Sequence, residues 1–219
     1  MQLQEWLELY RRIRMDFGFS EEEDARAAKV LRDAVRHRCS LSCLKQILGG
    51  REVNVFGAGP SLEELERIPE GTAIACDGAT SFLMERGRVP EVIVTDLDGR
   101  VEDILEASVL GSVVVVHAHA DNVEAVRRYA PKLRNVVPTA QVEPPEGVYN
   151  FGGFTDGDRA VFMAHALGAG QINLYGMDFG EKVGRYSFTP PTPRKLRKLE
   201  WGRRLLKVLE ERGATLRWC

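Results

Sequence analysis

Residues 92–117, which read VIVTDLDGRVEDILEASVLGSVVVVH, decide the fold class of this chain. A β-prone run at Val92–Thr95 precedes a helical pattern at Val101–Ala107, and a second β-prone run follows at Val113–His117. Strand, helix and strand at this spacing indicate a βαβ unit, whose two strands lie parallel in one sheet.

The same alternation continues on both sides of this unit, from residue 51 to the end of the chain. Further strands are expected at Val53–Phe56, Ala73–Cys76, Asn135–Pro138, Val148–Phe151, Ile172–Tyr175 and Thr215–Trp218. Further helices are expected at Leu62–Arg67, Ser81–Arg86, Val123–Tyr129, Arg159–Leu167 and Lys195–Arg212. The pattern predicts a doubly wound, mostly parallel α/β sheet of the Rossmann-like type.

The first 48 residues follow a helical pattern instead. Trp6, Leu7 and Tyr10 belong to an apolar stripe, and Ser20 with Glu23 forms a capping box that starts a second helix. We therefore divide the chain into an N-terminal helical segment, residues 1–48, and an α/β domain, residues 49–219. The segment carries no obvious chemistry, so we expect its stripe to pack on the α/β domain or on a second subunit in a homodimer.

Composition restricts the class of protein. With 44% hydrophobic and 28% charged residues among 219, the chain can build a core and is not disordered. No apolar run approaches the roughly 20 residues that span a bilayer, and the charged N-terminus does not suit a secretory signal. The four cysteines contain no Cys-x-x-Cys pair, which is typical of reduced thiols. We expect a cytoplasmic protein that does not bind membranes.

The net charge of −2 conceals an uneven distribution. Residues 49–180 carry ten basic and twenty acidic side chains, whereas residues 181–219 carry eleven basic and four acidic ones. An acidic middle with a basic tail is unusual for a protein that binds nucleic acid. It would suit a site that holds a divalent cation with carboxylates and polyphosphate with Lys and Arg, although a solvated surface with chance clustering explains the same counts.

Polar or glycine-rich clusters follow nearly every expected strand. They are Gly57–Ser61, Asp77–Ala79, Thr95–Gly99, His117–Asn122, Phe151–Asp158 and Gly176–Gly180. In an open parallel sheet the loops after the strands lie at one edge, where ligands bind. The positions therefore predict an active site at the carboxyl edge of the sheet.

Asp96 and Asp98 are the strongest candidates for metal ligands. Residues two apart in an extended chain project to the same side, so both carboxylates can reach one cation. Mg²⁺ prefers such hard oxygen ligands together with water and substrate phosphates. Asp77 and Asp121 could support the same ion. The alternative is that Asp-Leu-Asp-Gly only forms a turn.

The glycine-rich turn Gly57–Ser61 is a candidate phosphate cradle. Gly57 and Gly59 permit a tight turn and close approach of the backbone, and Ser61 starts an expected helix whose free N–H groups would face an anion. The turn is neither a P-loop nor the Gly-x-Gly-x-x-Gly motif. An ordinary connection between strand and helix is an equally good interpretation.

Two further clusters have alternative interpretations. His117 and His119, with Asp121, have the spacing of a zinc triad, but hydrogen bonding to substrate or a structural role suits them better. Asp156 and Asp158 open the helix that contains Arg159. They could cap that helix, or they could bind ligand hydroxyls, ring nitrogens or the water shell of the metal.

The order of these motifs resembles the archaeal 6-hydroxymethyl-7,8-dihydropterin pyrophosphokinases, which are related to thiamine pyrophosphokinases. The motifs are Gly-Ala-Gly-Pro-Ser, Cys-Asp-Gly-Ala, Val-Thr-Asp-Leu-Asp-Gly, His-Ala-His-x-Asp-Asn, Asn-Phe-Gly-Gly-Phe-Thr-Asp-Gly-Asp-Arg-Ala and Gly-Met-Asp-Phe-Gly, between about Asn54 and Trp201. The resemblance implies Mg²⁺-dependent transfer of diphosphate from ATP to the pterin hydroxymethyl oxygen, with release of AMP.

With this resemblance, each candidate residue receives an expected role. Asp96 and Asp98 hold the metal, supported by Asp77 and Asp121. The nucleotide or phosphate cradle and the residues that position substrate are expected at Gly57, Gly59, Ser61, Asn122, Thr155, Asp156 and Asp158. The alternatives are a thiamine pyrophosphokinase and a non-catalytic nucleotide or sugar-nucleotide binding module of a glycosylation system.

Overall fold

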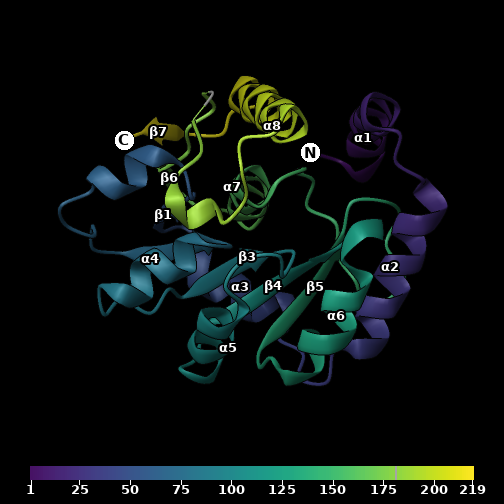
Figure 1. The fold of residues 1–219 in the computed structure, drawn as a ribbon, viewed down its shortest axis with the longest axis horizontal. Helices are drawn as coiled ribbons and strands as arrows, with labels where there is room; N and C mark the ends of the chain where they lie inside the picture. The colour runs from purple at the N-terminus through teal and green to yellow at the C-terminus, as the bar shows by residue number, and fades with distance from the viewer. Residues whose placement is uncertain (181) are drawn as a thin grey trace.

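The computed structural model describes residues 1–180 and 182–219, and this part of the chain contains one seven-stranded sheet (Figure 1). Its order is β5-β4-β3-β2-β1-β6-β7, and every neighbouring pair is parallel. The strands are β1 (Glu52–Phe56), β2 (Thr72–Cys76), β3 (Val92–Thr95), β4 (Val113–Ala118), β5 (Val136–Ala140), β6 (Gln171–Tyr175) and β7 (Leu216–Trp218). The predicted doubly wound, Rossmann-like fold is confirmed.

Helices cover both faces of the sheet. They are α1 (Leu3–Phe17), α2 (Glu21–Ala34), α3 (Leu41–Leu48), α4 (Ala79–Glu85), α5 (Val101–Val109), α6 (Val123–Tyr129), α7 (Asp156–Ala166) and α8 (Pro193–Glu211). Successive side chains of a strand point to opposite faces, so Val55 joins the core beneath α1, α3, α7 and α8, while Phe56 joins the core beneath α4, α5 and α6. Among the described residues, no helix is both long and apolar enough to cross a membrane.

The strand order reverses at β1, which lies between β2 and β6. The chain adds β2 to β5 on one side of β1, and then returns to add β6 and β7 on the other. Such a reversal leaves a crevice beyond the carboxyl ends of β1 and β6. The turns after β1 and β6 meet there, since the Gly59 amide donates to the Gly176 carbonyl oxygen at 2.8 Å.

Residues 1–48 form three helices rather than the two expected from the sequence. The third, α3, begins after Ser40, whose side chain accepts from the Cys43 amide. Trp6 and Tyr10 of α1 are buried against the α/β core, and α2 runs beside α6 at the β5 edge of the sheet (Figure 1). The three helices thus extend both layers that cover the sheet.

Two expected elements are wrong. No strand forms at Val148–Phe151, where Tyr149 alone bridges to Thr139 of β5, because Gly152 and Gly153 with positive φ turn the chain away. The expected helix Leu62–Arg67 is instead a short 3₁₀ helix, Pro60–Glu64. It does not continue because the backbone of Leu65, with φ −72° and ψ 105°, is extended.

Candidate active site

A cavity of about 350 Å³ lies along the carboxyl edge of the sheet. Its wall includes residues that follow six strands, from Gln141 after β5 to Asp178 after β6. The clusters expected at this edge therefore do converge. A volume of this size is within the range of small-molecule sites.

Three carboxylates meet beyond the ends of β2 and β3. Oxygen atoms of Asp77, Asp96 and Asp156 all lie within 4.8 Å of one another, and Asp98 lines the cavity with them. The Thr95 hydroxyl donates to Asp77 Oδ1 at 2.7 Å and fixes its orientation. Metal ligation by Asp77, Asp96 and Asp98 was expected from the sequence. The structure gathers Asp156, expected to position substrate, with the first two of these.

The charges of these carboxylates perturb one another. Burial and the charge of Asp96 raise the pKa of Asp77 to about 6, and burial with the charges of Asp96 and Asp77 raises the pKa of Asp98 to about 8. Burial followed by the same neighbouring charges raises the pKa of Asp156 well above its usual value. Burial opposes ionisation of Asp96 too, but the hydrogen bond and charge of His119 outweigh it and lower this pKa to about 2. A bound cation would relieve the repulsion in this cluster.

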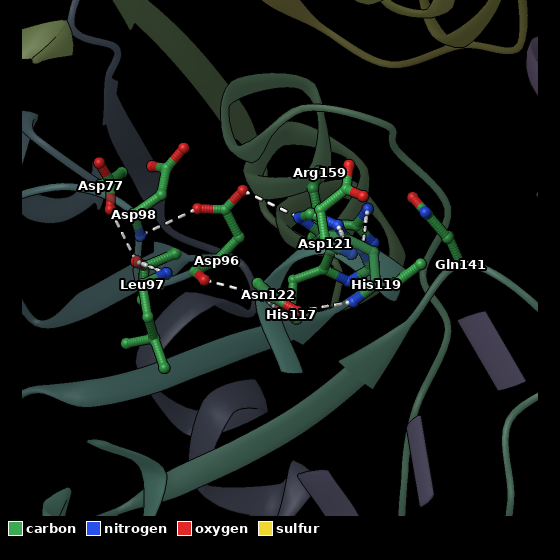
Figure 2. Close-up of polar contacts among 12 residues, drawn as sticks. Asp77, Asp96, Leu97, Asp98, His117, His119, Asp121, Asn122, Gln141 and Arg159 are labelled. Atoms are coloured by element: carbon green, nitrogen blue, oxygen red, sulfur yellow. Dashed lines mark hydrogen bonds and ion pairs between the residues drawn. The ribbon is translucent and has the colours of Figure 1, made fainter. Parts of the chain in front are cut away.

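The loop after β4 supports the carboxylates from one side (Figure 2). His119 Nε2 lies 3.2 Å from Asp96 Oδ2. The side-chain amide nitrogen of Asn122, Nδ2, donates to the backbone oxygens of Asp96 and His117 at 2.7 and 2.8 Å. Asn122 Oδ1 accepts from the His119 amide. His117 instead contacts Arg159, so the two histidines have different partners and do not converge as a zinc triad would.

Basic side chains of α8 face the acidic cluster across the cavity. Arg194, Lys195 and Lys198 line it together with Lys182 of the preceding loop. Arg194 approaches Asp121 at 3.4 Å, and the Asp121 side chain is 61% exposed at the cavity wall. Arg185, in the same loop as Lys182, does not line the cavity and pairs with Glu63 instead.

The glycine turn after β1 is packed tightly against the turn after β6. A Cβ atom on Gly59 would lie 2.3 Å from Asp178 Oδ2, and one on Gly57 would lie 2.6 Å from the Gly176 carbonyl oxygen. Ser61 donates to Asp178 Oδ2 from both its hydroxyl and its amide, at 2.7 and 2.9 Å. Close approach of the two turns therefore requires both glycines, and Gly57 and Gly59 also line the cavity.

Asp158 and Thr155 have defined places at the start of α7. The carboxylate of Asp158 is fully buried and accepts from the amides of Phe154 and Thr155 and from the Thr155 hydroxyl. These bonds form a capping box that satisfies the free N–H groups of the helix start. Thr155 lines the cavity together with Asp156.

The cavity also contains residues that the sequence did not single out. Asp24 of α2, Gln141 after β5 and Asp178 after β6 all line it. Asp24 stands in the acidic first turn of a helix, where Asp and Glu are common for electrostatic reasons. Only the tertiary fold distinguishes it from Glu21, Glu22 and Glu23.

Comparison with known proteins gives consistent matches. The family model "6-hydroxymethylpterin diphosphokinase MptE-like" matches residues 29–184. Three archaeal relatives named "6-hydroxymethyl-7,8-dihydropterin pyrophosphokinase" are similar over nearly their full length. The protein of Methanothermobacter thermautotrophicus is 48% identical, with 97% of each chain covered. That of Pyrococcus furiosus is 46% identical over 97% of this chain and 96% of the relative, and that of Methanocaldococcus jannaschii is 38% identical with 97% of each covered.

Proposed function

This chain belongs to the MptE-like 6-hydroxymethylpterin diphosphokinase family, and on that basis we propose that it transfers diphosphate from ATP to 6-hydroxymethyl-7,8-dihydropterin. The reaction joins the acceptor hydroxymethyl oxygen to the β-phosphorus of ATP and breaks the bond between the α,β-bridging oxygen and that phosphorus. The hydroxyl proton is lost, and AMP is released. The product is the pterin diphosphate ester.

The carboxylate cluster is the observation that best supports this proposal. Asp77, Asp96 and Asp156 offer a set of oxygen ligands of the kind that Mg²⁺ prefers. An ion held by these residues would neutralise the negative charge of the phosphates. Asp98 would act as a further ligand or accept hydrogen bonds from the ion's water shell, and His119 holds the carboxylate of Asp96 in place.

Residues on the other walls complete the proposed machinery. Lys195 and Lys198 face the carboxylates from α8 and would bind the transferred phosphates as point charges. The part of the cavity lined by Gly57, Gly59 and Gly176 would take the nucleotide, since the switch point of a doubly wound sheet is where such ligands bind. Asp121 would act at the cavity wall, through its contact with Arg194.

Asn122, Thr155 and Asp158 would position the substrates indirectly. Asn122 joins the loops after β3 and β4, and Asp158 caps the helix that presents Asp156. Ser61 would act through Asp178.

The homodimer, the cytoplasmic location and the absence of nucleic acid partners stay predictions from the sequence. Light scattering of the purified protein tests the homodimer.

The experiment is an acceptor panel incubated with the enzyme, ATP and Mg²⁺, in which AMP and ADP are separated by chromatography. We expect AMP with the dihydropterin at a kcat/KM at least ~10²-fold above that with thiamine, or ~3 kcal/mol. Equal or better turnover of thiamine would overturn the choice of acceptor. If neither acceptor gave AMP, the chain would be a binding module.

A further inference from the structure

A polar recess lies at the β4–β5 end of the cavity, apart from the carboxylate cluster and the glycine turns. It contains Asp24, His117 and Gln141, which come from α2, the end of β4 and the segment after β5. All three are more than nine-tenths buried. The metal-binding and phosphate-binding roles proposed above do not involve these three side chains.

Asp24 is held rigidly but keeps capacity to accept hydrogen bonds. Its carboxylate accepts from the Ala120 amide at 2.9 Å, from the Tyr10 hydroxyl, and from Gln141 Nε2 at 3.4 Å. A carboxylate has about four lone-pair sites, so one is left, and the long contact with Gln141 can give way to a ligand. Trp6 fixes the backbone of Gln141 through its indole N–H, at 2.8 Å.

His117 offers a hydrogen-bond donor at the same place. Arg159 approaches its Nε2 at 3.1 Å, and a guanidinium can only donate, so Nε2 is the acceptor in this contact. The ring proton of the neutral imidazole must then be on Nδ1. This buried atom makes no well-formed hydrogen bond among the described residues, although the side chain of Gln141 is close enough to interact with the ring. An unpaired buried donor is unfavourable, and an acceptor atom of a ligand would satisfy it.

Building on the diphosphokinase function, we propose that Asp24, His117 and Gln141 bind the amino-oxo-pyrimidine edge of the acceptor ring. That edge presents an amino group and an adjacent ring N–H, which suit a carboxylate, and then a carbonyl oxygen, which suits an imidazole N–H. The adenine edge of ATP places a lone pair beside its amino group, and a carboxylate repels it. The rings of Phe19 and Phe154 line the same cavity and would contact a flat heterocycle.

This placement orders the two substrates along the sheet edge. In Figure 2, Asp96 lies between Asp77 and Asp98 on one side and His117 and Gln141 on the other. The carboxylates stand beyond β2 and β3, between the recess at β4–β5 and the nucleotide crevice at β1–β6. Diphosphate transfer requires donor and acceptor on opposite sides of the reacting phosphate, which this order provides. The N-terminal segment therefore contributes to the active site.

The test compares the parent with Asp24→Asn, using Asp33→Asn, an exposed aspartate on α2, as the matched control. The acceptors are the dihydropterin and an analogue with oxygen in place of the 2-amino group. We expect Asp24→Asn to raise KM for the dihydropterin at least ~10-fold, and KM for ATP less than ~2-fold. The parent should prefer the amino compound over the oxygen analogue, and Asp24→Asn should reduce this preference at least ~10-fold. The control Asp33→Asn should leave both KM values and the preference unchanged.

A second variant and a binding assay keep the test decisive if Asp24→Asn folds poorly. Gln141→Leu removes the neighbouring amide, and binding of the fluorescent oxidised pterin is titrated without ATP or metal. Weaker pterin binding with unchanged ATP binding supports the subsite. A rise in KM for ATP alone would place adenine in the recess, and unchanged pterin binding in both variants would refute the proposal. Pterin binding without AMP release would refute the proposed reaction and leave the subsite standing.

Discussion

Replacing Asp77 with Asn should make the metal-free protein more stable while it disables the enzyme. Asp77 has φ 44°, in the left-handed region that Asn also tolerates, and Asn can still accept the hydrogen bond from Thr95. The substitution thus keeps the local geometry and removes one negative charge from beside Asp96. The carboxylate is unfavourable for the fold unless a cation is bound.

The size of the effect follows from the pKa of Asp77. Burial and the charge of Asp96 raise it from 3.8 to about 6, and this difference corresponds to about 3 kcal/mol. The folded protein holds the proton more tightly than the unfolded chain does. The contribution to stability is therefore complete below pH 3.8 and is lost as the pH rises through about 6. At pH 8 the variant should gain about 5–10 °C in Tm, and at pH 4 almost nothing.

Thermal unfolding in EDTA at both pH values measures this effect, and titration with Mg²⁺ shows whether stabilisation by the ion disappears in Asp77→Asn. Asp33→Asn is again the control, because its carboxylate is exposed and paired with Arg32. The Asp77→Asn variant should lose at least ~10²-fold in kcat/KM. A lower or equal Tm at pH 8, or full activity, would refute the assignment of Asp77 to the charged cluster.

Three further outcomes are expected. Asp96→Asn or Asp98→Asn should lower kcat/KM at least ~10²-fold at saturating Mg²⁺ with an unchanged circular dichroism spectrum, and near-parental turnover would contradict metal ligation. The apparent affinity for Mg²⁺, measured by calorimetry, should increase from pH 6 to pH 8, because Asp98 with a pKa of about 8 must lose its proton; a flat profile would exclude it from the site. Gly59→Val should both lower Tm and raise KM for ATP, because the valine side chain would clash with Asp178. If neither value changed, the turn would be able to move and accommodate the side chain.

The layout of the sheet could be predicted because local pattern and tertiary packing agree there. The strands Val92–Thr95 and Val113–Ala118 are short and mainly β-branched, and the helix between them has an apolar face, so all three elements are nearly as expected. Val148–Phe151 is also β-prone, but only Tyr149 pairs with β5, since the two glycines that follow turn the chain away. Composition alone does not report that loss of pairing.

The site was predictable where its residues directly follow a strand of the sheet, as Asp77 and Asp96 do. Asp96 and Asp98 follow one strand, and the carboxyl edge of the sheet gathers such loops. The position of Asp156 near Asp77 depends on how α7 packs, and that of Asp24 depends on α2 lying against β4 and β5. Neither arrangement leaves a periodic or spacing signal in the sequence. For this reason the sequence of the first 48 residues shows no sign of chemistry.

Aspartates in and beside the cavity differ in what surrounds their carboxylates, and like-charged neighbours mark the group that suits a cation. Asp158 is surrounded by N–H and O–H donors of its own chain, as expected for a carboxylate that stabilises a helix start. Asp77, Asp98 and Asp156 instead face other carboxylates, and burial with like charge raises the pKa of each. A fold under selection for stability alone would not keep three such groups together, because replacing any of them relieves repulsion. The cation proposed above would explain their proximity, and the phosphates that it would bind would explain the lysines of α8 that line the same cavity.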